Sequence, residues 1–160
     1  MKKTIGLILI AFAFISYLQG QNFTSSSLPI VVINTNGNTI EDDPKVAVDI
    51  GIIDNGPGNL NYLTDPFNAY NGHCGIEFRG NSTQGFDKKT YSIELWTSAG
   101  LDTSASILGL PKEEDWILHA NHVDKTFLRN TLSYHIWRKI GYWSSNTIYV
   151  ELVLDGDYRG

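Results

Sequence analysis

Cysteine is almost absent from this sequence, in which Cys74 is the only one among 160 residues. One thiol cannot form a disulfide within the chain, so a hydrophobic core must hold the fold together without covalent cross-links. Cys74 lies in a strand-like run, and we interpret it as a buried structural thiol rather than a reactive one. The sequence therefore excludes the small disulfide-stapled domains that are common among exported proteins.

Positive charge is also scarce. Lys and Arg number 12 against 17 Asp and Glu, which gives a net charge of −5. Without Lys2 and Lys3 at the start of the chain, the balance is 10 against 17, a net of −7. Non-specific binding to nucleic acid requires a positive face that displaces counterions. The composition therefore argues against a nucleic-acid partner.

Long apolar runs are missing except at the start of the chain. Two lysines precede the uncharged run Thr4–Ser16, and residues 18–20 place a small residue at a suitable cleavage point. This layout predicts a signal peptide over residues 1–20 and a secreted or cell-envelope protein. The run is shorter than the roughly 20 residues of a membrane span, although an uncleaved N-terminal anchor is the alternative. No later segment is apolar enough to predict a stable span.

A single domain follows a short polar lead-in over residues 21–27. In the domain, β-branched runs alternate with turns rich in Gly, Asn or Pro, which is typical of a strand-rich fold. Residues 54–70 have no clear period and predict a surface excursion. The runs 74–79 and 89–96 predict a hairpin with a long connection. The predicted strands cover residues 28–35, 45–53, 74–79, 89–96, 116–119 and 147–154.

One helix is predicted, beginning at an Asp124 cap and continuing to about Ile140 before Gly141. Its apolar residues recur every four positions, which predicts a buried stripe. The stripe consists of Leu128, Leu132, Ile136 and Ile140.

A tight turn at Asp155-Gly156 predicts a returning strand, yet the sequence ends four residues later at Gly160. We therefore expect residues 28–160 to be the N-terminal portion of a domain truncated at its C-terminus. A natural domain seldom ends in half a hairpin.

The loop between the two hairpin strands is the first candidate site. Small residues at Gly80, Asn81 and Ser82 offer N–H groups and a hydroxyl that can surround phosphate oxygens. Arg79 precedes them, and the pair Lys88-Lys89 follows at the other rim. Lys89 is in phase with the apolar face of its strand, so it needs a partner such as a phosphate or Glu77. Composition alone favours a surface hairpin whose lysines end in solvent.

Two other groups of residues have simpler structural explanations. The spacing of His119, His122 and Asp124 is compatible with a metal site, but a strand end, a loop and a helix cap explain the three separately. The four tryptophans are compatible with a sugar-stacking platform. Trp116 and Trp137 are expected in the core instead. No Ser-His-Asp order stands in a nucleophile elbow, which argues against a hydrolase.

Three long stretches, taken together, resemble the CotH kinase family, which is named for spore coat protein H. The opening LPIVVINTNGNTI also fits such domains, so the resemblance covers most of residues 28–160. The resemblance implies an α+β, atypical protein-kinase-like fold whose N-terminal portion is rich in antiparallel sheet, with one main helix. The three stretches are FRGNSTQGFDKKTYSIEL, LGLPKEEDWILHANHVDKTFLRN and YVELVLDGDYRG.

The resemblance can be followed residue by residue. Residues Arg79–Gln84 correspond to the family's RGNSSQ loop, and Lys88 and Lys89 correspond to its paired lysines. It implies binding of ATP phosphates, with Lys89 as the main candidate, Lys88 and Arg79 as weaker ones, and Gly80, Asn81 and Ser82 in the loop. The second stretch matches the family's DKT..RN helix start.

The same resemblance implies an exported transferase that uses ATP and Mg²⁺ to phosphorylate Ser or Thr of secreted or surface proteins. We expect its catalytic and metal-binding residues beyond the equivalent of Gly160, so this chain is expected to be an inactive fragment. Asp155 and Asp157 are assigned to a turn and not to a metal. The alternative is a non-catalytic exported adhesion or carbohydrate-binding module of the same fold.

Overall fold

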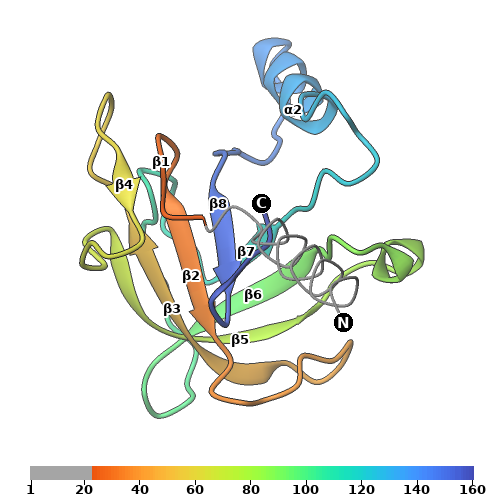
Figure 1. Cartoon of the computed structure of the whole chain (residues 1–160). Helices are drawn as coiled ribbons and strands as arrows, with labels where there is room; N and C mark the ends of the chain where they lie inside the picture. Colours follow the sequence, from red (N-terminus) through yellow and green to blue (C-terminus); the bar gives the residue numbers. More distant parts are fainter. Residues whose placement is uncertain (1–22) are drawn as a thin grey trace, which may run out of the picture.

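The computed structural model describes residues 23–160, and the predicted signal peptide lies outside them. Most of this part of the chain forms one curled sheet, with a helix standing apart from it (Figure 1). The elements are β1 (Ser25–Ser26), β2 (Ile30–Asn34), β3 (Val46–Ile53), β4 (Asn61–Tyr62), β5 (Tyr70–Phe78), the 3-10 helix η1 (Ser82–Gly85), β6 (Tyr91–Trp96), β7 (Asp115–Leu118), α2 (Arg129–Lys139), β8 (Glu151–Leu154) and β9 (Asp157–Tyr158).

The seven-stranded sheet has the order β7-β6-β5-β3-β2-β8-β9, and β1 pairs with β4 in a separate ribbon. Every neighbouring pair in the large sheet is antiparallel except β2 and β8, which run parallel with Ile30 opposite Glu151. The predicted hairpin is confirmed as β5 and β6, with Cys74 opposite Leu95. The sheet-rich α+β class is therefore confirmed, although the sheet is mixed.

The core lies on one face of this sheet because apolar residues alternate along the strands. On β3, Val48, Ile50 and Ile52 are buried in the same cluster as Cys74 and Leu95. The free Cys74 is fully buried, which confirms its structural role. The opposite face carries a smaller cluster, formed by Ile30, Ile53 and Val153 with three half-buried neighbours.

The curl of the sheet brings its two ends close together. Lys88 lies just before β6, and Gly160 follows β9, yet a Cβ placed on Gly160 would lie 2.5 Å from Lys88 Nζ. Burial raises the pKa of Tyr91 on β6, while the charge of Arg159 at the end of β9 acts in the opposite direction. Residues at the end of the chain therefore sit beside the hairpin that carries the candidate loop.

The predicted tight turn at Asp155-Gly156 is confirmed, and β9 is the returning strand. The Asp155 carboxylate accepts hydrogen bonds from the N–H and the hydroxyl of Thr35, each at 2.8 Å. Asp155 therefore ties the turn after β8 to the end of β2, and it acts as a structural clamp.

The excursion over residues 54–70 is ordered by asparagines. Asn61 on β4 is 1% exposed, accepts a hydrogen bond from the N–H of Asn55 at 2.6 Å and donates one to the carbonyl of Leu28 at 2.8 Å. Part of the predicted lead-in also forms structure, because β1 pairs with β4.

The predicted helix exists, but the prediction that it has a buried apolar stripe is wrong. Helix α2 begins at Arg129, five residues after Asp124, and contains no buried residue. Leu128, Leu132, Ile136 and Ile140 are each more than half exposed. The reason is that α2 projects beyond the sheet and does not pack on it, as Figure 1 shows. Trp137, expected in the core, is 47% exposed, whereas Trp116 on β7 packs against the core as predicted.

The chain after α2 also departs from prediction. Residues 147–150 were expected to be strand, but they run alongside the helix, and Tyr149 donates its hydroxyl proton to the carbonyl of Phe127 at 2.5 Å. Strand β8 therefore begins only at Glu151. No helix within residues 23–160 has the length and apolarity to cross a membrane.

Candidate functional site

The loop of residues 79–89 joins β5 to β6 and folds back on itself. Its base is closed by the Arg79 N–H, which donates to the carbonyl of Thr90 at 2.9 Å. The Thr83 hydroxyl donates to the Arg79 carbonyl at 3.2 Å, and the Gln84 amide donates to the Gly80 carbonyl at 2.6 Å. Side chains of the loop therefore bind its own backbone, which fixes its shape.

Gly80 is required at the first corner of this loop. Its φ is +92°, a conformation that residues with a Cβ rarely adopt. A Cβ at this position would also lie 2.2 Å from the Thr83 hydroxyl oxygen, so the bond that closes the corner would be lost.

The N–H groups of Gly80, Asn81 and Ser82 donate to no other atom within residues 23–160. Asn81 and Ser82 are exposed, and Asn81 makes no side-chain cap. Three consecutive free N–H groups that begin at a glycine with positive φ are the kind of backbone donor array that binds anions.

Lys89 is half-buried at the other end of the loop. Its Nζ donates to the carbonyl of Gln84 at 2.5 Å and lies 6.0 Å from the centre of the Phe78 ring. The prediction that this lysine needs a partner is confirmed, but the partner is a backbone carbonyl. The prediction that Glu77 could be this partner is wrong, because Glu77 lies beside Lys45 instead.

Glu77 lies on the opposite face of the sheet and belongs to a cluster that our sequence analysis missed. Lys45, just before β3, lies 3.0 Å from Glu94 and 3.9 Å from Glu77. The hydrogen bond to Glu94 is the largest cause of a raised pKa at Lys45. Strand alternation contained the signal, because residues 77 and 94 fall on the face opposite Ile76 and Ile93.

The three predicted cations, Arg79, Lys88 and Lys89, differ in their exposure and in their neighbours. Arg79 is exposed, and Lys88 is half-buried beside Gly160. Lys88 and Lys89 are adjacent in the chain, but Lys89 turns toward the loop backbone while Lys88 turns toward the end of the chain.

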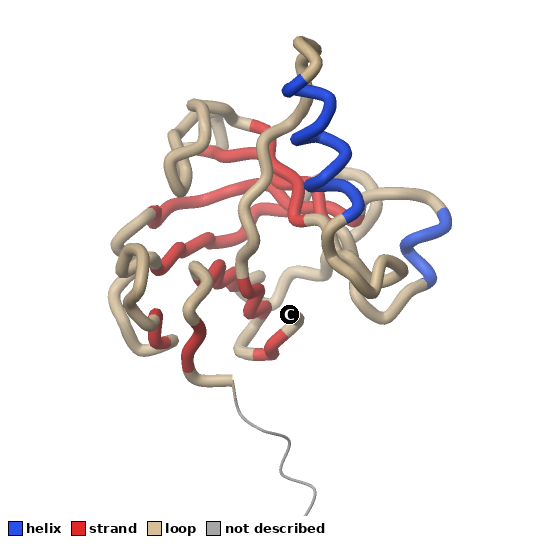
Figure 2. Tube along the Cα trace, turned by 90° about the horizontal axis from the view of Figure 1, so that it is seen from above, coloured by secondary structure: helices blue, strands red, loops and turns tan. Residues whose placement is uncertain are grey.

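The second resembling stretch contacts this loop directly. The ring of Phe86 stacks on that of His122, with centroids 4.8 Å apart. The Ala120 N–H donates to the Thr90 hydroxyl at 3.1 Å. Both η1 and α2 lie on the same side of the molecule (Figure 2). The three stretches that carried the resemblance, including the terminal one through Gly160, therefore meet in space.

Asp124 organises the second stretch. One of its oxygens accepts bonds from the N–H and the hydroxyl of Thr126, and the other accepts the N–H of Arg129 at 2.9 Å. These bonds, with the Thr126 hydroxyl as the largest cause, lower the pKa of Asp124. Asp124 thus binds the first N–H of α2 across a turn, in place of the adjacent cap that the pattern predicted; the cap position is Leu128.

The histidines of this stretch have separate contacts. His119 Nε2 lies 2.9 Å from the Asn130 amide nitrogen, and His122 stacks on Phe86. Within the described part of the chain, no three His, Cys, Asp or Glu side chains are grouped as a metal site.

The fold and the site together define a curled-sheet domain with a small, self-bonded loop rimmed by cations at one end. Amide N–H groups and Lys or Arg side chains are the donors that proteins use to hold phosphate oxygens. The loop brings such donors together, beside the Asp42 carboxylate, which accepts a hydrogen bond from the Gln84 amide at 2.5 Å, and Asp87 of the loop itself.

Comparison with families of known proteins matches residues 76–160 to the family described as CotH kinase protein. The match covers more than half of the chain, so the protein belongs to this family. It includes the whole 79–89 loop and everything that follows. A search of curated proteins finds no match.

Proposed function

We propose that this protein is an exported CotH-type atypical kinase, with an atypical kinase-like fold, that transfers phosphate from ATP to Ser or Thr of secreted or surface proteins. The observation that carries the proposal is the meeting of the 79–89 loop with the 119–130 stretch and Gly160. Membership of the family supports the kinase class, and the free N–H groups and cations of the loop support phosphate binding.

In this proposal, the loop holds the phosphates of ATP. The N–H groups of Gly80, Asn81 and Ser82 donate to phosphate oxygens, while Lys88, Lys89 and Arg79 offset their charge. Lys89 Nζ donates one hydrogen bond to the Gln84 carbonyl, and its ammonium group has two further N–H donors for phosphate oxygens. When bound, ATP supplies the phosphoryl group to be transferred.

The residues assigned here bind and orient the nucleotide. The general base and the carboxylates that would hold Mg²⁺ are not among them, and we propose that residues outside this chain provide both. Residues 23–160 would then bind nucleotide without transferring phosphate. Export, which rests on the predicted signal peptide, requires that ATP be present where the mature protein acts.

The test compares ATP binding by the purified original protein with ATP binding by its Lys89→Ala variant. We expect the ATP dissociation constant to rise at least about tenfold, because a charge-assisted contact to phosphate contributes roughly 1.5–3 kcal/mol. Lys89→Arg should retain most of the affinity. Calorimetric titration gives the constant, and a thermal unfolding curve shows whether the loop still folds.

Lys112→Ala is the matched control, because Lys112 is exposed and lies outside the loop. It removes one positive charge and should leave ATP affinity unchanged. Equal affinity in Lys89→Ala and the original protein would refute the role of Lys89, and no ATP binding by the original protein would refute the nucleotide site.

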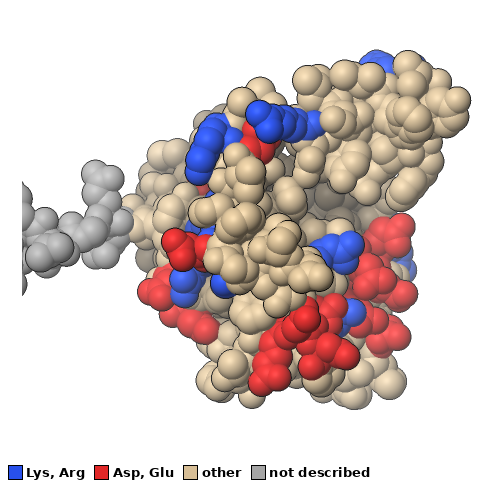
Figure 3. All heavy atoms as spheres, turned by 90° about the vertical axis from the view of Figure 1, so that its right-hand side faces the viewer, with Lys and Arg blue, Asp and Glu red and all other residues tan. Residues whose placement is uncertain are grey.

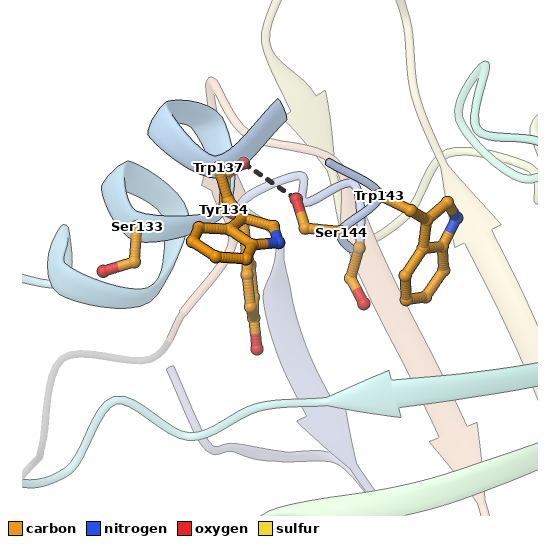
Figure 4. A pocket seen from close by; sticks show the side chains of 6 residues that line it. Ser133, Tyr134, Trp137, Trp143 and Ser144 are labelled. Carbon is orange, nitrogen blue, oxygen red and sulfur yellow. Dashed lines mark hydrogen bonds between the residues drawn. The ribbon is translucent and has the colours of Figure 1, made fainter. Parts of the chain in front are cut away.

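The second candidate, an exported carbohydrate-binding module, is favoured by one observation. Trp137 and Trp143 are 47% and 87% exposed and border a shallow hollow with the hydroxyl-bearing Ser133 and Ser144 (Figure 4). Exposed indole rings are suited to stacking on sugars. This function predicts glycan binding that Trp143→Ala abolishes, without any thermal shift on addition of ATP.

A further inference from the structure

Three consecutive peptide units of the loop between β5 and β6 are held by their carbonyl groups. The carbonyl of Arg79 accepts a hydrogen bond from the Thr83 hydroxyl at 3.2 Å, and that of Gly80 accepts one from the Gln84 amide at 2.6 Å. The third carbonyl, that of Asn81, accepts the N–H of Gln84 at 3.4 Å. All three carbonyls are therefore directed toward residues of the loop itself.

A held carbonyl also fixes the N–H group of the same peptide unit. Peptide units are planar and trans, so the C=O of one residue and the N–H of the next point in opposite directions. Carbonyls directed into the loop therefore direct the N–H groups of Gly80, Asn81 and Ser82 away from it. These are the three N–H groups that make no hydrogen bond within residues 23–160. The donor array is thus oriented by the hydrogen bonds on its opposite side.

Gln84 contributes three contacts to this arrangement. Its amide holds the Gly80 carbonyl, and its N–H reaches the Asn81 carbonyl. Its own carbonyl accepts a hydrogen bond from Lys89 Nζ at 2.5 Å. Gln84 is half-buried, so these contacts are partly shielded from water. One residue thereby connects the free N–H groups to the lysine that is the main candidate for phosphate binding.

The Gln84 amide is itself anchored outside the loop. It donates a second hydrogen bond to the Asp42 carboxylate at 2.5 Å, across 42 positions of the chain. The segment that carries Asp42 is fixed on the sheet, because Ile40 is buried in the core and the Glu41 carbonyl accepts the Phe78 N–H at 2.7 Å. Since Phe78 ends β5 directly before the loop, Asp42 is a well-fixed acceptor at the base of the loop.

The negative charge of Asp42 opposes the binding of a phosphate, so its position beside the loop needs an explanation. Figure 3 views the molecule from the side on which the loop projects in Figure 1, and acidic side chains lie there among basic ones. In a protein of net charge −5, an anion is held by directed donors rather than by overall charge. The hydrogen bond from Gln84 gives the Asp42 carboxylate a role in directing those donors.

We propose that Gln84, anchored on Asp42, is a positioning residue that directs the loop N–H groups and Lys89 toward a bound phosphate chain. It acts through Gly80, Asn81 and Lys89 rather than by contact with the ligand. This role rests on the proposed function, because the phosphate chain is that of ATP.

The first test compares the ATP dissociation constants of the purified protein and its variants by calorimetric titration. Gln84→Ala changes no charge and should raise the constant about fivefold, because the hydrogen bonds of the amide are lost. Asn59→Ala is the matched control, since the Asn59 amide also donates to a carbonyl four residues away, that of Asn55 at 2.7 Å, but outside the loop. It should leave the constant unchanged, and thermal unfolding shows whether both variants fold.

Asp42 gives a prediction whose sign differs from that of charge alone. Removal of a carboxylate from beside an anion should tighten binding, as we expect for Asp43→Ala at an exposed neighbour. Asp42→Ala should instead bind ATP at least about threefold more weakly than Asp43→Ala, because Gln84 loses its anchor. Asp42→Asn keeps an acceptor oxygen and should bind at least as tightly as the original protein. In Gln84→Ala, the further change Asp42→Ala should cause no additional weakening.

NMR signals of the amide groups report the orientation of the donors. Saturating tripolyphosphate, which is the phosphate chain without the nucleoside, should shift the signals of Gly80, Asn81 and Ser82 in the original protein. In Gln84→Ala the shift at Asn81 should be lost. The shift at Gly80 should remain, because Thr83 still holds the preceding carbonyl.

The positioning role is overturned if Gln84→Ala binds ATP as tightly as its control, or if Asp42→Ala and Asp43→Ala bind it equally. Persistence of the Asn81 shift in Gln84→Ala would overturn it as well. Each of these outcomes leaves the proposed function intact when the original protein binds ATP and Lys89→Ala weakens that binding. If the original protein binds neither ATP nor tripolyphosphate, the proposed function fails and the positioning role fails with it.

Discussion

At the scale of single residues, Lys45 is the cation that pairs with Glu77 and Glu94 on the face of the sheet opposite Ile76 and Ile93. Its side chain and those of Glu77 and Glu94 are each about 22–23% exposed, so their charges are only partly hydrated. Because the pKa of Lys45 is raised, this ion pair stabilises the fold throughout the neutral range. On the alkaline side, the contribution is lost as the pH rises through the folded-state pKa of Lys45.

Lys45→Met should therefore lower the free energy of unfolding by about 1–2 kcal/mol, because it leaves two partly buried carboxylates without a cation. Urea denaturation followed by circular dichroism measures the change. Lys112→Met, which removes an exposed lysine, is the control and should change it by less than about 0.5 kcal/mol. An equal effect of the two substitutions would show that the cluster contributes nothing.

Cys74 should be inert in the folded protein. It is fully buried on β5, and burial raises the pKa of its thiol to about 12. Since the thiolate is the reactive form, we expect Ellman's reagent at pH 8 to modify it at least about 100-fold more slowly than in guanidinium chloride. Rapid modification without denaturant would show that β5 opens or that the thiol is accessible.

At the scale of elements, the sheet and α2 should differ in stability. Strands β3 and β5 carry the buried core, whereas α2 contains no buried residue. Isolated helices shorter than about 12–15 residues are marginal in water. Its recorded side-chain contacts run to chain segments near it in sequence, such as His119 before it and Ser144 and Thr147 after it.

Hydrogen exchange should therefore show amides of α2 protected by no more than about 1–2 kcal/mol, and those of β3 and β5 protected to the global unfolding free energy. Mass spectrometry of peptides covering residues 46–53 and 129–139 makes the comparison within one sample. Equal protection of the two peptides would mean that α2 is packed in solution.

At the scale of the whole molecule, the clamp between Asp155 and Thr35 joins positions 120 residues apart. It sits where the parallel strands β2 and β8 end, and this pair is the step that attaches the C-terminal hairpin to the sheet. The approach of Gly160 to Lys88 depends on that attachment.

Asp155→Gly should lower the free energy of unfolding by about 1–3 kcal/mol, because two hydrogen bonds to a charged acceptor are lost. Glycine tolerates the native φ of +50°, so backbone strain does not contribute. Asp157→Gly is the control on the same hairpin, since its carboxylate contacts only the exposed Arg159. Thermal unfolding of both variants gives the comparison, and a smaller loss in Asp155→Gly than in the control would contradict the clamp.

Local pattern predicted much of this fold. The alternation of VAVDIGII gave a strand that differs from β3 by one residue, and the hairpin of β5 and β6 followed from two apolar runs with a polar loop between them. The parallel pairing of β2 with β8 was not predictable, because its partners are separated by most of the domain and no local signal specifies them.

The helix shows the limit of periodicity. An apolar residue every fourth position predicts that one face of a helix is covered, but it does not say by what. In α2, the stripe from Leu128 to Ile140 is exposed because the helix projects beyond the sheet. The same limit applies to the candidate loop. The sequence showed which residue types it contains, but it did not predict the hydrogen bond from Lys89 to the Gln84 carbonyl.

The sequence by itself determined the strand-rich class, the single buried thiol, the turn at Asp155-Gly156 and the family, because each depends on residues close together in the chain or on matched order. Only the tertiary structure decided which segments meet. The approach of Gly160 to Lys88 follows from how the sheet curls, whereas the stacking of Phe86 on His122 joins two loops and α2 is exposed because it projects beyond the sheet. Curl is a sum of twists over many paired strands, so no short stretch of sequence encodes it.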